Sequence, residues 1–169
     1  ARAGARFDRR LTSVSFPKDL LRQATMLARH EPRRPKQSSL RRAVSATYYA
    51  VFHLLTEEAA AFFIKGQHAK PLRQALRRAF VHSTMKTVAK GFASGQPARV
   101  IMDAAGPISQ DLRGIADGFV QLQEARHRAD YDLSQSFTKQ EALDLIELGE
   151  RVLSSWNSVR TQRDAQAML

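Results

Sequence analysis

The chain has 169 residues, a formal net charge of +11 and 43% hydrophobic residues, values that suit one globular domain with a substantial core. It contains no cysteine, which excludes disulfide scaffolds, cysteine-ligated zinc and thiol catalysis. No apolar run approaches the roughly 18 residues of a membrane span, so we expect no membrane association and a cytoplasmic protein. The first residues lack an initiator methionine and an apolar signal core, which predicts a trimmed start.

The positive charge is distributed unevenly along the chain. Residues 1–42 hold 12 basic and 3 acidic side chains, and residues 43–100 hold 8 and 2. Residues 101–169 hold 7 basic and 11 acidic side chains, so the last part is mildly acidic. A basic excess of this size in a small domain indicates a polyanionic partner, which is usually nucleic acid.

The first hundred residues predict a basic extension and three helices. The extension covers residues 1–16, and the first helix opens at Pro17, a residue favoured in the first helical turn. It ends before residues 31–36, which contain two prolines. Apolar residues spaced by three and four predict a long second helix over 38–64 and a third over 68–90.

The remaining sequence predicts a glycine- and proline-rich connection and two more helices. The connection covers residues 91–107, and the fourth helix starts near its end. The last helix opens at residues 138–141 with the spacing of a capping box. No period-two alternation indicates a strand, so we expect an all-α fold, an up-and-down antiparallel bundle of about five helices over 17–160. A polar tail, 161–169, is expected to fray.

One arginine lies inside the apolar pattern of the fourth predicted helix. At about 100° per residue, Arg126 falls in the middle of the stripe formed by Leu112, Ile115, Phe119 and Leu122. A buried guanidinium is costly unless it is paired. Asp130, four residues later, is one possible partner, and an anionic ligand or a second chain is another. Arg126 and Asp130 are therefore candidate site residues, with a purely structural ion pair as the alternative.

Adjacent tyrosines in the second helix form another candidate feature. Tyr48 and Tyr49 face different ways on a helix, so one suits the core and the other provides a polar contact. His53 lies one turn after Tyr49. It is either a half-buried, hydrogen-bonded histidine or a site residue that faces the same cleft as Arg126.

Two groups of basic residues are candidates for phosphate binding. One lies where the second helix begins, and the other lies on the third predicted helix. A solvated face is the simpler interpretation, but the charge excess makes phosphate contacts at least as favourable. The nucleic-acid candidates are Arg41, Arg42, Lys70, Arg73, Arg77 and Arg78.

Two segments together resemble a known family. Residues 40–53 read LRRAVSATYYAVFH and residues 126–132 read RHRADYD. They are similar to the S-x-x-YYA-x-F-H helix and the R-x-x-ADYD segment of small prokaryotic HEPN proteins, in the family's order. The resemblance implies a helical bundle, often a homodimer. It also implies either a metal-independent RNase of a toxin–antitoxin or defence system, or a protein that binds RNA or nucleotides without cleaving, or the partner of a nucleotidyltransferase.

The resemblance also shows where this chain departs from the RNase members. Those members carry an R-x(4–6)-H motif, whereas positions 131 to 133 after Arg126 are Tyr, Asp and Leu. His127 directly follows the arginine and points elsewhere on the helix. Tyr131 has an unperturbed pKa of about 10, which makes it a poor base at neutral pH. Only one Glu-x-x-His pair exists, so we expect no metal site and no cofactor.

Three functions follow as alternatives. The first is a homodimer that binds RNA or a nucleotide, with Arg126 in a cleft between subunits and the basic residues holding phosphates. The second is an active RNase that uses Arg126 with Asp130, Tyr131 or His53. The third is an interaction module for a nucleotidyltransferase, with Arg126 structural. The missing histidine argues against the second function, and the basic excess favours the first two over the third.

Overall fold

A computed structural model describes residues 15–66 and 69–169, so the predicted extension 1–16 lies mostly outside the described residues. The described chain is all-helical, as predicted, and contains no strand within those two ranges. Its helices are α1 (Phe16–Arg29), α2 (Gln37–Phe63), α3 (Lys70–Ala79), α4 (His82–Ala93), α5 (Arg99–Ala105), α6 (Gln110–Tyr131), α7 (Lys139–Val159) and α8 (Arg163–Met168).

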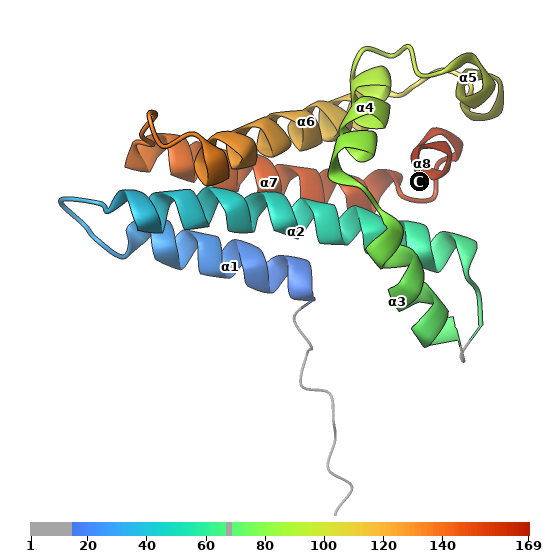
Figure 1. The fold of residues 1–169 in the computed structure, drawn as a ribbon. Helices are drawn as coiled ribbons and strands as arrows, with labels where there is room; N and C mark the ends of the chain where they lie inside the picture. Colours follow the sequence, from blue (N-terminus) through green and yellow to red (C-terminus); the bar gives the residue numbers. More distant parts are fainter. Residues whose placement is uncertain (1–14, 67–68) are drawn as a thin grey trace, which may run out of the picture.

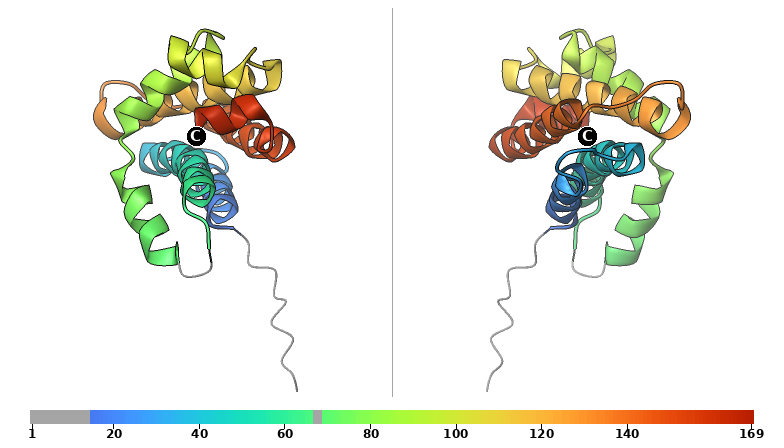
Figure 2. Two further views of the ribbon diagram at one scale, coloured as in Figure 1. Left: turned by 90° about the vertical axis from the view of Figure 1, so that its right-hand side faces the viewer. Right: turned by 90° about the vertical axis from the view of Figure 1, so that its left-hand side faces the viewer.

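Four long helices form an up-and-down antiparallel bundle. Helices α1, α2, α6 and α7 alternate in direction in chain order (Figure 1). Helix α2 lies at the centre and packs against α1, α6 and α7. Helix α3 packs against α2, and Figure 2 shows it apart from α6 and α7, while α4 packs across α6. The central position of α2 explains why most of its turns are buried.

The core consists of aromatic and branched side chains at helical spacing. Its largest fully buried members include Trp156 of α7, Tyr48 of α2 and Phe119 of α6. Two glycines allow α7 to approach its neighbours closely. A Cβ on Gly118 would lie 2.6 Å from Val152, and one on Gly149 would lie 2.7 Å from Thr47. Larger residues at these two positions would force the helices apart.

The ends of α6 and α7 follow recognisable capping chemistry. Thr138 Oγ1 accepts from the backbone N–H of Glu141 at 3.1 Å, and Glu141 Oε2 accepts from the N–H of Thr138 at 2.7 Å. The predicted capping box is therefore confirmed. Helix α6 starts three residues later than expected, because Ser109 provides its N-cap through the N–H of Leu112.

The predicted third helix is wrong as a single element. The chain forms α3 and α4, separated by extended backbone at Phe80 and Val81. In a continuous helix, residues 80 and 82 would lie about 200° apart and could not both face the bundle. The break lets Phe80 pack against the core while His82 contacts Tyr48. Tertiary contacts thus outweigh the local helical preference.

Two short helices occupy segments for which we predicted none. Helix α5 forms within the predicted connection, and α8 forms where the tail was expected to fray. Asp164 and Ala165 of α8 are buried, and Asp164 Oδ2 accepts from the N–H of Ser109 at 2.9 Å. The tail therefore packs against the bundle. Within the described ranges, no helix is long and apolar enough to span a membrane.

Candidate functional site

Arg126 lies at the contact between α6 and α2, where its side chain is 14% exposed. Its Nη2 donates to the hydroxyl of Tyr49 at 3.1 Å, and the guanidinium lies over the rings of Tyr49 and Tyr131. Nε is 2.6 Å from Asp130 Oδ2. The Nε–H is not well aligned with this oxygen, so the contact is an ion pair rather than a linear hydrogen bond. The charge of the guanidinium is therefore paired within the chain.

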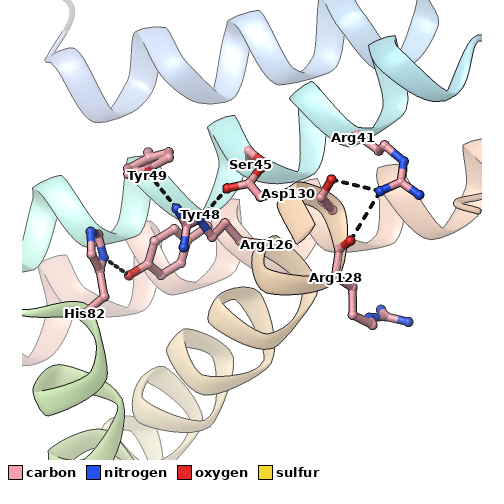
Figure 3. A network of polar contacts seen from close by, with 9 residues as sticks. Arg41, Ser45, Tyr48, Tyr49, His82, Arg126, Arg128 and Asp130 are labelled. Atoms are coloured by element: carbon pink, nitrogen blue, oxygen red, sulfur yellow. Dashed lines mark hydrogen bonds and ion pairs between the residues drawn. The ribbon is translucent and has the colours of Figure 1, made fainter. Parts of the chain in front are cut away.

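Asp130 links Arg126 to α2. Its Oδ2 faces Arg126, and its Oδ1 accepts from Ser45 Oγ at 2.5 Å (Figure 3). Ser45, Tyr49, Arg126 and Asp130 thus form a connected set, which we call the Arg126 cluster. The expected pairing of Arg126 with Asp130 is present, and it extends to two side chains of a second helix. Because both carboxylate oxygens are engaged, Asp130 is poorly placed to accept a proton.

The electrostatics of the cluster keep Arg126 charged. Burial alone would lower the pKa of Arg126, but the electrostatic interactions with Tyr49 and Asp130 and the hydrogen bond to the Tyr49 hydroxyl outweigh burial and raise it above its usual value. A guanidinium stays protonated at neutral pH, so Arg126 can stabilise negative charge but cannot transfer protons. In the cluster, the Asp130 carboxylate balances its charge.

Tyr48 and His82 form a second polar contact beside the cluster. The Tyr48 hydroxyl and His82 Nδ1 are 2.6 Å apart. Burial raises the pKa of Tyr48 well above its usual value. Burial, together with the nearby charge of Arg126, lowers the pKa of His82. Both shifts keep the tyrosine and the histidine neutral at pH 7, and the direction of the hydrogen bond between them depends on the histidine tautomer.

His53 reaches the cluster through Tyr49. Its ring stacks on Tyr49 with centroids 6.1 Å apart, and it also lies 5.1 Å from Phe16. Burial lowers the pKa of His53, and the charge of Arg77 adds to this effect. His53 and Arg126 therefore contact the same tyrosine, although no direct contact joins them among the described residues.

An open groove of about 380 Å³ lies between α2 and α6 along the cluster. We call it the α2–α6 groove. Its lining combines two arginines and a serine with three residues of the Arg126 cluster. The lining residues are Ser38, Arg41, Arg42, Ser45, Tyr49, Ala129 and Asp130. Three members of the Arg126 cluster thus face a surface hollow that also contains two arginines.

Arg41, one of the predicted phosphate ligands, is occupied by the backbone. Its guanidinium donates to the carbonyls of Arg128 and Ala129 at 3.3 and 2.9 Å, to that of Asp132 at 3.0 Å, and to that of Gln135. These carbonyls belong to the end of α6 and the following loop, where helical carbonyls lack intrahelical partners. Arg41 therefore caps α6. Arg42, the next residue, is exposed and has no ion pair within the described ranges.

The basic residues of α3 likewise include some that are bound to other groups of the chain and some that are exposed. Arg73 donates to the carbonyls of Ile64 and Gly66 at the end of α2, and Arg77 pairs with Glu57 at 3.0 Å. Lys70 and Arg78 are exposed and form no ion pair with any described residue. Of the six predicted phosphate contacts, three thus hold the fold and three remain on the surface. The surface residues are Arg42, Lys70 and Arg78.

The remaining predicted site residue, Tyr131, is 63% exposed and contacts both Arg126 and His127 through its ring. Sequence reasoning missed Ser45 and His82. Ser45 is the serine of the S-x-x-YYA pattern and lies one turn before Tyr49, so its position on the same helix face was a usable signal. His82 had no signal, because the helix break that turns it toward Tyr48 was not predicted.

Comparisons of the chain with protein-family models, with curated proteins and with solved structures find no match. The resemblance to HEPN domains therefore stays a prediction from two sequence segments. Within the described ranges, no three His, Asp or Glu side chains gather in an arrangement suited to a metal ion. The functional argument consequently depends on the geometry of the Arg126 cluster and on the distribution of charge.

Proposed function

We propose that this chain binds RNA through its phosphates, along a path that includes the α2–α6 groove. The observation that carries the proposal is the mostly buried charge of Arg126, whose partners Tyr49 and Asp130 line an open groove beside Arg42. Buried arginines attract and orient phosphate oxygens.

The positions of the free basic residues favour RNA over a mononucleotide. Arg77 of α3 pairs with Glu57 of α2, so Glu57 marks the place where α3 contacts α2. Arg42 lies 15 residues before Glu57 on the same helix. This spacing corresponds to about 22 Å along the helix and about 60° around it. The groove and the exposed cations Lys70 and Arg78 are therefore separated by a distance that an oligonucleotide spans and a single nucleotide does not. Such contacts provide affinity rather than sequence selection.

The experiment is a titration of a fluorescent single-stranded RNA, followed by anisotropy over a series of KCl concentrations. We expect binding that weakens steeply with salt, because bound cations release counterions from the phosphates. Arg42→Glu should weaken binding at least tenfold. Arg22→Glu provides the matched control, because Arg22 is an exposed arginine of α1 outside the groove. The proposal would be refuted if the two substitutions changed RNA affinity equally, or if the affinity did not depend on the salt concentration.

We further propose that the groove becomes a cleft between two copies of the chain. Shortly after Arg126 in the sequence, the side chains of Tyr131 and Leu133 are 63% and 83% exposed. Large apolar residues this exposed, next to a polar site, are typical of interfaces. Leu133→Asp should shift the protein from dimer to monomer in sedimentation velocity. A wild-type monomer at micromolar concentration would contradict this part of the proposal.

RNA cleavage is a second candidate, and the position of His53 is the observation that favours it. A neutral histidine beside the tyrosine that binds Arg126 supplies a base near a phosphate-binding cation. Asp130 and Tyr131 are poorer bases, because Asp130 is engaged on both oxygens and a tyrosine is protonated at neutral pH. Under this hypothesis, EDTA-resistant cleavage of the RNA disappears in His53→Gln while RNA affinity persists. Cleavage that survives the substitution would remove His53 from the mechanism.

A further inference from the structure

A cavity of about 130 Å³, partly open to the surface, lies between α2, α4, α6 and α8 and is also lined by Phe80. Its walls are almost entirely apolar, and Thr84 is the one described lining residue with a polar side chain. The main wall residues are Leu55, Ala59, Met85, Val88, Phe119 and Met168. None of these residues belongs to the Arg126 cluster.

We propose that this cavity is a binding site for a small, uncharged apolar ligand with the size of one aromatic ring. The volume supports the size, because an enclosed apolar cavity of about 150 Å³ takes up benzene. A bound water needs two to four polar partners, whereas the described lining offers a single hydroxyl. The interior is otherwise close-packed, so a gap of this volume differs from ordinary packing.

The residues that leave this space open also support a ligand. Ala59 and Ala89 line the cavity at positions that are 1% and 2% exposed. Larger aliphatic residues at these buried positions would fill the gap. Two of the other walls, Met85 and Met168, are flexible thioethers that adapt to the shape of a ligand and make favourable contacts with aromatic rings.

Helix α8 covers the cavity and is anchored at its opposite end. Met168 and Leu169 line the cavity, while Asp164 holds the start of the helix through the N–H of Ser109 at 2.9 Å. Arg163 adds a contact of 2.5 Å from its Nε to the carbonyl of Ala104. The Met168 end of α8 therefore forms part of the cavity wall, while the polar contacts hold the opposite end of the helix.

Methyl NMR of ¹³C-labelled methionine tests the proposal directly on the full chain. The chain has four methionines, of which Met85 and Met168 line the cavity, whereas Met26 is 68% exposed on α1. Benzene and toluene should shift the Met85 and Met168 signals saturably and leave Met26 unchanged. Imidazole, a polar ring of similar size, should bind at least tenfold more weakly. Unchanged Met85 and Met168 signals up to the solubility limit of benzene would overturn the proposal.

Filling variants separate the cavity from nonspecific apolar binding. Ala59→Phe should abolish the benzene-induced shifts, whereas Ala61→Phe, at an exposed position of the same helix, should retain them. If Ala59→Phe does not fold, Ala89→Leu provides a smaller filling substitution with the same expected loss. Benzene shifts that persist in a folded filling variant would place the ligand elsewhere and refute the site. Each outcome is independent of RNA binding.

Discussion

Arg41 and Arg126 lie at the same contact between α2 and α6 but bind different kinds of partner. Arg41 donates to backbone carbonyls at the end of α6 and in the following loop. Arg126 contacts the side chains of Tyr49 and Asp130. Backbone carbonyls cannot move away without unwinding the helix end, whereas side chains exchange partners at low cost. We therefore expect Arg41 to contribute mainly to stability, and we propose Arg126 as the residue that contributes to ligand binding.

Arg41→Ala should produce the largest change in stability. It leaves several carbonyls at the end of α6 without their charged donor, and we expect a loss of about 2 kcal/mol in the free energy of unfolding. Urea denaturation measures this loss. Arg42→Ala is the matched control, because Arg42 is exposed and its removal should change stability by less than about 0.5 kcal/mol. Equal stabilities of the two variants would show that the capping contacts do not hold α6.

The double substitution Lys70→Glu with Arg78→Glu should weaken RNA binding without changing stability. Both residues are exposed, unlike Arg73 and Arg77, which are bound to α2. We expect the slope of log affinity against log salt to fall by about one for each phosphate that the variant no longer neutralises. Salt-dependent anisotropy measures the slope. An unchanged slope would exclude α3 from the path of the RNA and confine binding to the α2–α6 groove.

The pH dependence of stability should report on His82 and produce the smallest effect. Burial and Arg126 lower the pKa of His82 below its usual 6.5, so the unfolded chain binds protons more readily than the folded chain. Stability is therefore fully present above pH 6.5 and falls as the pH decreases toward the lowered value. His82→Gln retains an acceptor for Tyr48 but does not titrate, so it should reduce this dependence. Urea midpoints at about pH 7.5 and 5.5, on either side of the usual histidine pKa, provide the measurement. If the pH dependence of stability is the same in His82→Gln as in wild type, it arises from His53 or other groups and not from His82.

Sequence patterns predicted the parts of this molecule that depend on local rules. Hydrophobic spacing predicted the four long helices, and the Thr138–Glu141 spacing predicted a capping box that is present. The break between α3 and α4 was not predictable in this way, because it is caused by the contacts of Phe80 and His82 with distant residues. Helix α8 likewise depends on Asp164 reaching Ser109, 55 residues away.

The candidate site shows the same division between local and distant contacts. The apolar stripe identified Arg126 as an embedded charge, and the spacing of four identified its pairing with Asp130. The sequence could not show that Arg41, Arg73 and Arg77 are engaged with carbonyls or with Glu57, since charge counts do not distinguish bound arginines from free ones. The structure therefore reduces the predicted phosphate surface to its exposed members.

The most direct test of the account is RNA affinity in the double variant Arg126→Met with Asp130→Asn. The substitution removes both charges of the ion pair, retains an acceptor for the Ser45 hydroxyl, and should leave the fold intact. We predict that circular dichroism and the unfolding midpoint stay close to wild type while RNA affinity at low salt falls at least tenfold. A folded double variant that binds RNA as tightly as wild type would show that Arg126 is structural and would contradict the central claim.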